Sequence, residues 1–266
     1  MRGQFSGLRH YPFAGSALNR LVIHPDLVDA AARYCATTDL DIYKIELWSK
    51  YSGAVNYEQA HHRDYGGHTL AVTQEADDFR MMTNFILLSD ITADTGPTKV
   101  VPLDHTRHLS RHLGEIEPER DPVGPFGEGA FRDVEVSITG TAGSIFIYHP
   151  DVVHRGTALL GDEVSRFVLL VDFSPVRKRW TGKHSWPTHA ASPLWKEPFI
   201  AMTPYERTLF GFPGVDDHFW DEQTIRDTAN RYAGMDMTPY DEAMRQRKPS
   251  TTANVKEGSD APSRRT

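Results

Sequence analysis

Residues 144–173 have the sequence SIFIYHPDVVHRGTALLGDEVSRFVLLVDF, and this stretch determines the class of fold that we expect. Three short apolar runs are separated by His149-Pro-Asp and Leu160-Gly-Asp, which are typical turn sequences. The last run, Phe167–Phe173, is apolar and rich in branched residues, as buried strands are. We therefore expect consecutive strands joined by turns rather than by helices.

The same pattern continues upstream to about residue 41. Eight strand-like runs are separated by Gly, Pro, Asp and Asn signals: Ile42–Trp48, His68–Gln74, Met81–Asp90, Thr98–Pro102, Val134–Thr139, Ser144–Tyr148, Val152–Leu159 and Arg166–Phe173. Eight strands without intervening helices predict a sandwich, a jelly roll or a barrel. A long Gly- and Pro-rich connection at residues 110–131 is expected to be a functional or disordered loop.

Helices are expected on both sides of the strand-rich region. Leu27–Cys35 has a helical pattern, and Asp26 is its predicted cap. Thr203 and Thr238 each precede a Pro and stand three residues before an acidic residue, which predicts two helix starts with Thr as the cap. A further helix is expected over residues 221–233. We expect the C-terminal helices to pack on the outside of the strands.

The length of 266 residues is compatible with one large domain, because all-β barrels of about 200–250 residues often fold as a single unit. We expect this domain to span residues 1–244, with its β core at about residues 40–175 and its C-terminal helices at about residues 203–244. Residues 245–266 hold more basic than acidic residues and contain no aromatic residue, so a disordered tail is predicted.

The composition excludes several classes of function. The single cysteine, Cys35, rules out an intrachain disulfide and a cysteine-based zinc cluster. The net charge is −7, and the acidic body that precedes the basic tail argues against a nucleic-acid partner. Neither a signal peptide nor an apolar run near the roughly 20 residues of a membrane span is visible. We therefore expect a cytoplasmic protein with no membrane partner.

The 13 histidines contain the signal for a metal site. Two His and one carboxylate on one face of the ion form the non-heme Fe(II) site. Residues i and i+2 of a strand lie on one face, roughly 6.6 Å apart, and can reach one ion. Three pairs have this spacing: His24–Asp26, His62–Asp64 and His149–Asp151. Pro lies at the centre of the first and third pairs and cannot donate to a strand ladder, so His62 and Asp64 are the expected ligands. His61 would face the other way.

His154 is the expected third ligand, because it begins a late strand and lies near Arg166. The turn Leu160-Gly-Asp lies near the midpoint between the two residues, so the chain reverses and both side chains can reach one pocket. Their strands either pair directly or face each other across a barrel. A buried Arg needs an anionic partner, and its planar fork suits a carboxylate. The alternatives for Arg166 are a side chain that extends to solvent or an ion pair with Glu163.

The sequence resembles the phytanoyl-CoA dioxygenase family of Fe(II)/2-oxoglutarate oxygenases over about residues 40–175. Three family segments occur in the family's order: Q-x-x-H-x-D at Gln59, His62 and Asp64; a Gly-Pro segment leading to P-x-x-H at Gly96–His105; and A-G-S, H-R-G and R at Ala142, His154 and Arg166. The usual P-G-S-H of the family is Pro102-Leu-Asp-His105 in this chain. The resemblance implies a mainly β fold, a double-stranded β-helix (a jelly-roll or cupin-like barrel) with flanking α-helices.

The resemblance also implies a set of site residues and an activity. The implied residues are His62, Asp64 and His154 for Fe(II), and Arg166, Gln59 and Thr98 for the cosubstrate 2-oxoglutarate. The carboxylate at Asp64 indicates hydroxylation or a similar oxidation rather than halogenation. The implied activity is that of an Fe(II)/2-oxoglutarate-dependent dioxygenase, an oxidoreductase that uses O2 to oxidise a small-molecule substrate and releases succinate and CO2.

Two other functions remain open at this point. A cupin-like metalloenzyme that uses the same ligands without 2-oxoglutarate predicts no role for Arg166. A catalytically silent metal- or ligand-binding protein of the same fold predicts that His62 or Asp64 is misplaced or metal-free. The identity of the substrate and the oligomeric state are not indicated by the sequence.

Overall fold

The computed structural model describes residues 6–64, 68, 80–109, 126–127, 129–176, 186–189 and 192–247. The chain divides into two compact units, Met1–Pro213 and Gly214–Thr266, and each is described by itself. The single domain expected over residues 1–244 stays a prediction. Most of the connection at residues 110–131 and of the tail at residues 245–266 lies outside the described residues.

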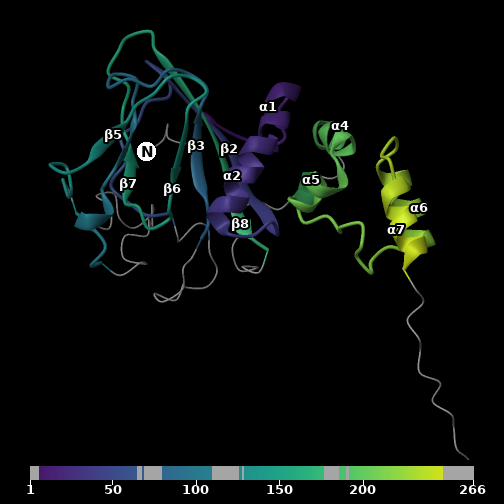
Figure 1. Ribbon diagram of the computed structural model, residues 1–266. Helices are drawn as coiled ribbons and strands as arrows, with labels where there is room; N and C mark the ends of the chain where they lie inside the picture. Colours follow the sequence, from purple (N-terminus) through teal and green to yellow (C-terminus); the bar gives the residue numbers. More distant parts are fainter. Residues whose placement is uncertain are drawn as a thin grey trace, which may run out of the picture. The chain divides into compact units, whose positions relative to one another are not determined.

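Five antiparallel strands form the larger sheet of the first unit (Figure 1). Their order across the sheet is β1 (Leu8–His10), β2 (Leu40–Tyr51), β8 (Ser165–Pro175), β3 (Thr83–Leu87) and β6 (Ile145–Tyr148). The two long strands pair from Leu40 opposite Pro175 to Tyr51 opposite Ser165, with a register shift between Ile42 and Lys44. This long β2–β8 ladder forms one wall of the site.

The smaller sheet consists of β5 (Val136–Ile138), β4 (Thr98–Val100) and β7 (His154–Gly156). His62 extends it through an isolated antiparallel bridge with His154. From β3 onward the strands are divided between the sheets, with β3, β6 and β8 in the larger and β4, β5 and β7 in the smaller. This is a jelly-roll arrangement, and the predicted mainly β fold class is confirmed. Because β7 and β8 belong to different sheets, they do not pair directly.

Both faces of the β2–β8 ladder are buried, and successive residues point to opposite faces. Ile45 and Leu169 are fully buried on one face, and α2 (Pro25–Cys35) packs against β8. The opposite face includes an apolar cluster of buried residues: Phe85, Leu87, Ile91, Tyr148, Val168 and Leu170. Burying the larger of these side chains stabilises the fold by about 1.5–3 kcal/mol each.

The N-terminal region contains two elements that the sequence patterns did not predict, β1 and α1 (Ser16–Leu21). The next helix, α2, was expected, but the predicted Asp26 cap is wrong. Pro25 occupies the first helical position, and Nδ1 of His24 accepts a hydrogen bond from the backbone N–H of Asp26 at 3.3 Å. The fixed φ of proline suits this first position, so the cap falls on His24 and Asp26 lies in the first turn.

Helices α4 (Pro193–Ala201) and α5 (Pro204–Thr208) follow the strands in the first unit. The predicted Thr203 cap is confirmed, since Thr203 and Glu206 form a reciprocal capping box. The backbone N–H of Ile42 in β2 donates to the carbonyl of Leu209 at 2.6 Å, which anchors the end of α5 to the larger sheet.

The second unit contains α6 (Glu222–Arg231) and α7 (Thr238–Gln246). The rings of Trp220 and Tyr240 lie 4.6 Å apart between centroids. The predicted Thr238 cap is wrong, because the carboxylate of Asp236 accepts from the backbone N–H of Thr238 at 2.9 Å, and Thr238 already lies inside the helix.

Seven of the eight predicted strand runs correspond to strands of the structure. The run His68–Gln74 lies outside the described residues except for His68, whose backbone is helical. Among the residues that are described, no helix has both the length and the apolar character needed to cross a membrane.

Candidate metal centre

His62, Asp64 and His154 are brought together by the smaller sheet. The backbones of His62 and His154 exchange two hydrogen bonds, of 2.9 and 3.0 Å. Asp64 follows two residues after His62, so its carboxylate faces both imidazoles. An antiparallel bridge between segments about 90 residues apart in the sequence therefore creates the three-residue group.

Hydrogen bonds to the backbone fix both imidazole rings. Nδ1 of His62 lies 2.8 Å from the carbonyl of Ala60, and Nδ1 of His154 lies 3.1 Å from the carbonyl of Val152. Because a carbonyl only accepts, each Nδ1 must carry the proton, and each Nε2 keeps a lone pair for a metal. These Nε2 atoms lie 3.5 Å and 3.6 Å from the carboxylate oxygens of Asp64.

The geometry and the protonation states suit a divalent metal ion. Bond lengths of about 2.0–2.2 Å place adjacent ligand atoms about 3–4 Å apart, and the distances of 3.5 and 3.6 Å from the two Nε2 atoms to Asp64 lie in this range. All three ligand atoms lie within 4.8 Å of one another. Burial lowers the pKa of His154 to about 4, which keeps its imidazole neutral at pH 7. Burial opposes ionisation of Asp64, but the basic side chains around it, which include His68 and Lys44, hold the pKa of its carboxyl well below its usual range. Two imidazoles and one carboxylate are the donor set of non-heme Fe(II).

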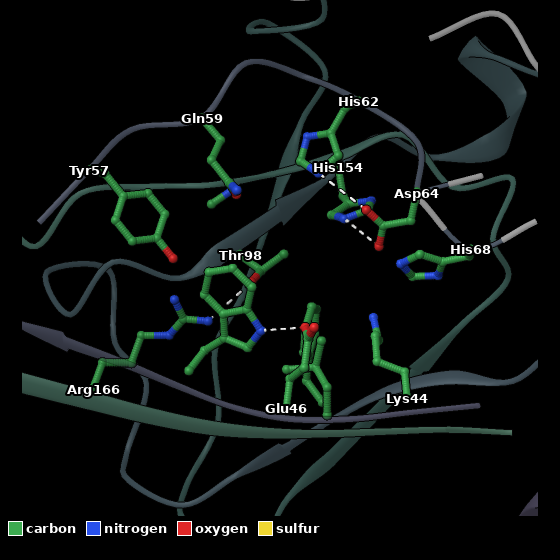
Figure 2. Close-up of a pocket in the computed structure, with 14 residues that line it drawn as sticks. Lys44, Glu46, Tyr57, Gln59, His62, Asp64, His68, Thr98, His154 and Arg166 are labelled. Carbon is green, nitrogen blue, oxygen red and sulfur yellow. Dashed lines mark hydrogen bonds and ion pairs between the residues drawn. The ribbon is translucent and has the colours of Figure 1, made fainter. Parts of the chain in front are cut away.

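The three side chains open onto a cavity of about 560 Å³ between the two sheets. Figure 2 shows Arg166, Tyr57 and Thr98 on one side of it and Lys44 and His68 on the other. The group formed by His62, Asp64 and His154 lies between these two ends. Among the cavity-lining residues, charged and polar side chains outnumber apolar ones.

Arg166 reaches the cavity from β8 and is 7% exposed. One Nη donates to Oγ1 of Thr98 at 3.3 Å, and Nε has no hydrogen-bond partner. Of the two alternatives considered from the sequence, exposure to solvent is excluded by burial, and no ion pair joins Arg166 to Glu163 or to another described acid. Burial lowers the pKa of this guanidinium, partly offset by Tyr57. An anionic ligand would relieve that cost.

Lys50 lies directly opposite Arg166 in the β2–β8 register. Its ammonium donates to the backbone carbonyls of Tyr57 and Thr157 and lies 3.8 Å from the centre of the Tyr57 ring. Burial, followed by the charge of Arg166, lowers the pKa of Lys50 to about 7. Two buried basic groups therefore stand next to each other at this end of the cavity.

Gln59 lines the cavity and also braces β7. Its side-chain Oε1 accepts from the backbone N–H of Gly156 at 2.7 Å, and the backbone N–H of Gln59 donates to the carbonyl of Gly156 at 2.9 Å. A Cβ at position 156 would lie 2.5 Å from Oε1 of Gln59, so this contact requires glycine. The carbonyl oxygen of the Gln59 amide is thus committed to the protein itself.

Sequence reasoning missed the wall opposite the metal ligands, which is formed by β2. Lys44, Glu46 and Trp48 all line the cavity, and Figure 2 shows the ammonium of Lys44 and the carboxylate of Glu46 directed into it. Lys44 pairs with Asp172 at 2.6 Å, and the Trp48 indole donates to Glu46 at 2.9 Å. The available signal was alternation, because charged residues at every second position of an apolar strand share one face.

The first 168 residues have a counterpart among known protein families. The family model described as phytanoyl-CoA dioxygenase matches residues 2–168. No curated protein sequence matches the chain.

Several solved structures of non-heme enzymes are similar to part of the chain. A non-heme α-ketoglutarate-dependent epimerase, SnoN from nogalamycin biosynthesis, is 20% identical over 60% of this chain and 56% of its own, with a TM-score of 0.42. A non-heme α-ketoglutarate-dependent carbocyclase, SnoK from the same biosynthesis, is 22% identical over 60% of this chain and 58% of its own, with a TM-score of 0.45. A nickel complex of the non-heme monooxygenase ThoJ is 16% identical over 64% of this chain and 58% of its own, with a TM-score of 0.43. The match therefore spans less than two thirds of the length of these structures.

Proposed function

The chain belongs to the phytanoyl-CoA dioxygenase family, and on that premise we propose that it is an Fe(II)- and 2-oxoglutarate-dependent dioxygenase. It hydroxylates, or otherwise oxidises, a small organic substrate, with release of succinate and CO2. The observation that supports this best is the placement of the His62–Asp64–His154 group and the buried guanidinium of Arg166 around one cavity.

The side chains proposed as histidine ligands are oriented by hydrogen bonds within the protein. His62, Asp64 and His154 would hold Fe(II), with both imidazoles oriented by backbone carbonyls. When bound, the iron supplies the activation of O2 and the oxidation of a C–H bond. The cavity beside these three side chains would leave room for the cosubstrate next to the metal.

Arg166 would bind the far carboxylate of 2-oxoglutarate. A guanidinium presents two parallel donors to a carboxylate, and the buried Arg166 has an Nε without a partner. Thr98 steadies the same guanidinium through its hydroxyl. Gln59 would help to shape the cosubstrate site, because it lines the cavity and its side chain accepts a hydrogen bond from the backbone of Gly156. The cosubstrate would therefore lie between the metal ligands and the Arg166 end.

The two alternative functions receive less support. A cupin-like metalloenzyme without 2-oxoglutarate gives no reason for a buried arginine without an acidic partner among the described residues. A silent binding protein gives no reason for three ligand atoms gathered within 4.8 Å.

The cavity also favours a particular kind of substrate. The charged side chains of Lys44 and Glu46 on its wall favour a polar molecule, since an apolar one would leave these groups without solvent. A cytoplasmic location fits such a substrate and remains part of the proposal.

An anaerobic thermal-shift experiment tests the proposed function. Melting of the protein is followed with Mn(II) or Fe(II), with and without 2-oxoglutarate, and a ligand at 100 times its Kd adds about 2.7 kcal/mol of stability. We expect one increment from the metal and a second from 2-oxoglutarate. A metal increment alone would favour the cupin-like enzyme, and no metal increment would favour the silent protein.

A further inference from the structure

A dense group of charged side chains lies behind the metal ligands, on the face of the smaller sheet that points away from the cavity. We call it the Arg155 cluster, and its members are Arg155, Glu135, Glu58, His61, Lys99 and Arg132. Arg155 is 1% exposed, and the side chains of Glu135 and His61 are 3% and 4% exposed. The proposed reaction uses none of these groups directly.

Arg155 is the centre of this cluster. Its Nε and one Nη donate to the two carboxylate oxygens of Glu135, each at 2.7 Å, in the parallel two-bond geometry typical of arginine and carboxylate. Its other Nη donates to Glu58. Glu58 also accepts from the backbone N–H of Ala158 at 2.7 Å and from Arg132 at 3.2 Å.

Glu135 joins three different segments of the smaller sheet. Besides Arg155 of β7, it accepts from Nζ of Lys99 in β4 at 2.8 Å. It also accepts from Nε2 of His61 at 2.9 Å, and His61 precedes the ligand His62. Burial lowers the pKa of His61, although Glu135 opposes this shift. One carboxylate thus ties β4, β7 and the segment that contains His62.

The cluster residues alternate with the proposed ligands along the chain. Arg155 directly follows His154, and His61 directly precedes His62. Because neighbouring residues of an extended chain point to opposite faces, the ligands face the cavity while the cluster binds the same two segments from behind. The same segments are also joined by the His62–His154 bridge and by hydrogen bonds of Gln59 with Gly156, of Asn56 with Leu159 and of Arg63 with the carbonyl of Asp151. Among these connections, the cluster is the one made by charged side chains on the residues adjacent to both histidines.

Fold stability alone does not account for such a cluster. Buried ion pairs often contribute no more stability than apolar residues of similar volume, because the charges lose their hydration. The value of a fixed network lies in geometry, since outer hydrogen bonds orient metal ligands and their loss reduces metal affinity by about 10–100-fold.

We propose that the Arg155 cluster is a positioning device that sets the distance between the His62 and His154 imidazoles and thereby the affinity of the metal centre. Through the hydrogen bonds of Arg155 to Glu58 and of Glu135 to His61, the Arg155–Glu135 pair holds β7 against the segment at residues 58–62. This inference rests on the proposed function for the presence of a metal, but it does not depend on 2-oxoglutarate.

Two variants test the proposal through metal binding alone. Glu135→Gln keeps the shape of the side chain and removes its charge. The double variant Arg155→Met/Glu135→Gln removes both charges of the central pair, so neither is left buried without its partner. The matched control is Arg132→Met, which removes the more exposed member and leaves the central pair intact.

Anaerobic titration with Co(II), followed by its visible absorption, reports both affinity and ligand geometry. We expect about 10–100-fold weaker binding in the double variant, a smaller loss in Glu135→Gln, and altered absorption bands in both. Circular dichroism should show that the metal-free variants remain folded, and Arg132→Met should bind as the wild type does.

Wild-type affinity and absorption in a folded double variant would overturn the proposal. Failure of both variants to fold would assign the cluster to folding and would overturn it as well. A wild-type protein that binds Co(II) but not 2-oxoglutarate would contradict the proposed function alone, whereas one that binds no metal would contradict both.

Discussion

Two buried lysines of the β2–β8 ladder, one towards each end, differ in whether an acidic residue stands opposite them. At one end Lys44 stands opposite Asp172 and forms a 2.6 Å ion pair with it. At the other end Lys50 stands opposite Arg166, and neither has an ion pair with an acid in the part of the chain that the structure describes. The first end is complete within the protein. The second has an excess of positive charge that a bound dianion such as 2-oxoglutarate would balance.

At the end with Lys44 and Asp172, mutation of one partner should cause the largest loss of stability. Asp172→Asn leaves Lys44 buried without its closest opposite charge, which we expect to reduce the free energy of unfolding by about 3–5 kcal/mol. Urea denaturation of the metal-free protein measures this loss. The double variant Lys44→Met/Asp172→Asn, which keeps an acceptor for the backbone N–H of Asn84, should recover most of it, and an equally large loss there would show that packing rather than charge is responsible.

At the end with Arg166 and Lys50, removing a charge should not reduce the stability of the metal-free protein. Arg166→Met removes a buried charge that has no described acidic partner, so we expect the metal-free protein to melt at the same or a higher temperature. The stabilisation of about 2.7 kcal/mol by 2-oxoglutarate at 100 times its wild-type Kd should disappear, while the metal increment remains. Arg9→Met, at an exposed position, is the matched control. An unchanged response to 2-oxoglutarate in Arg166→Met would contradict the proposed role.

A pH dependence should distinguish Lys50 from Lys44. The folded protein lowers the pKa of Lys50 to about 7 from its ordinary value of 10.5, so between these values the unfolded chain binds more protons than the folded one. Stability therefore rises with pH, and we expect this rise between pH 7 and 9 in the metal-free protein. Lys50→Met should flatten it. A slope that is equal in the variant and the wild type would place the titration elsewhere.

The smallest effect is expected at the hydroxyl that supports Arg166. Thr98→Val removes one hydrogen bond of 3.3 Å, and such a bond contributes about 0.5–1.5 kcal/mol. Calorimetry should show binding of 2-oxoglutarate weakened by up to about tenfold, with the metal affinity unchanged. Equal weakening for metal and cosubstrate would indicate a general disturbance of β4 instead.

Features that depend on neighbouring residues were largely predictable. The apolar runs identified seven strands, and the Thr203–Glu206 pattern gave the start of α5. Errors occurred where two local signals competed. Pro25 moved the cap of α2 to His24, and Asp236 moved the start of α7 ahead of Thr238.

The candidate metal ligands could be predicted from the sequence for a different reason. His62 and Asp64 have the spacing of a strand pair, and the turn between His154 and Arg166 indicated that both reach one pocket. The resemblance to a family then assigned the His62–Asp64 pair and the His154–Arg166 pair to one site. The structure brings His62, Asp64 and His154 within reach of one ion, and their role as ligands remains part of the proposed function.

The sequence alone determined the mainly β fold class, the order of the strands along the chain and the residues that we propose as metal ligands. The tertiary structure decided which strands share a sheet, that Arg166 faces Lys50 while Lys44 faces Asp172, and that Arg155 pairs with Glu135. The reason is that local patterns depend on residues within a few positions, where φ and ψ preferences and side-chain period act. Register between distant strands depends on the packing of the whole core, and it fixes which charges meet.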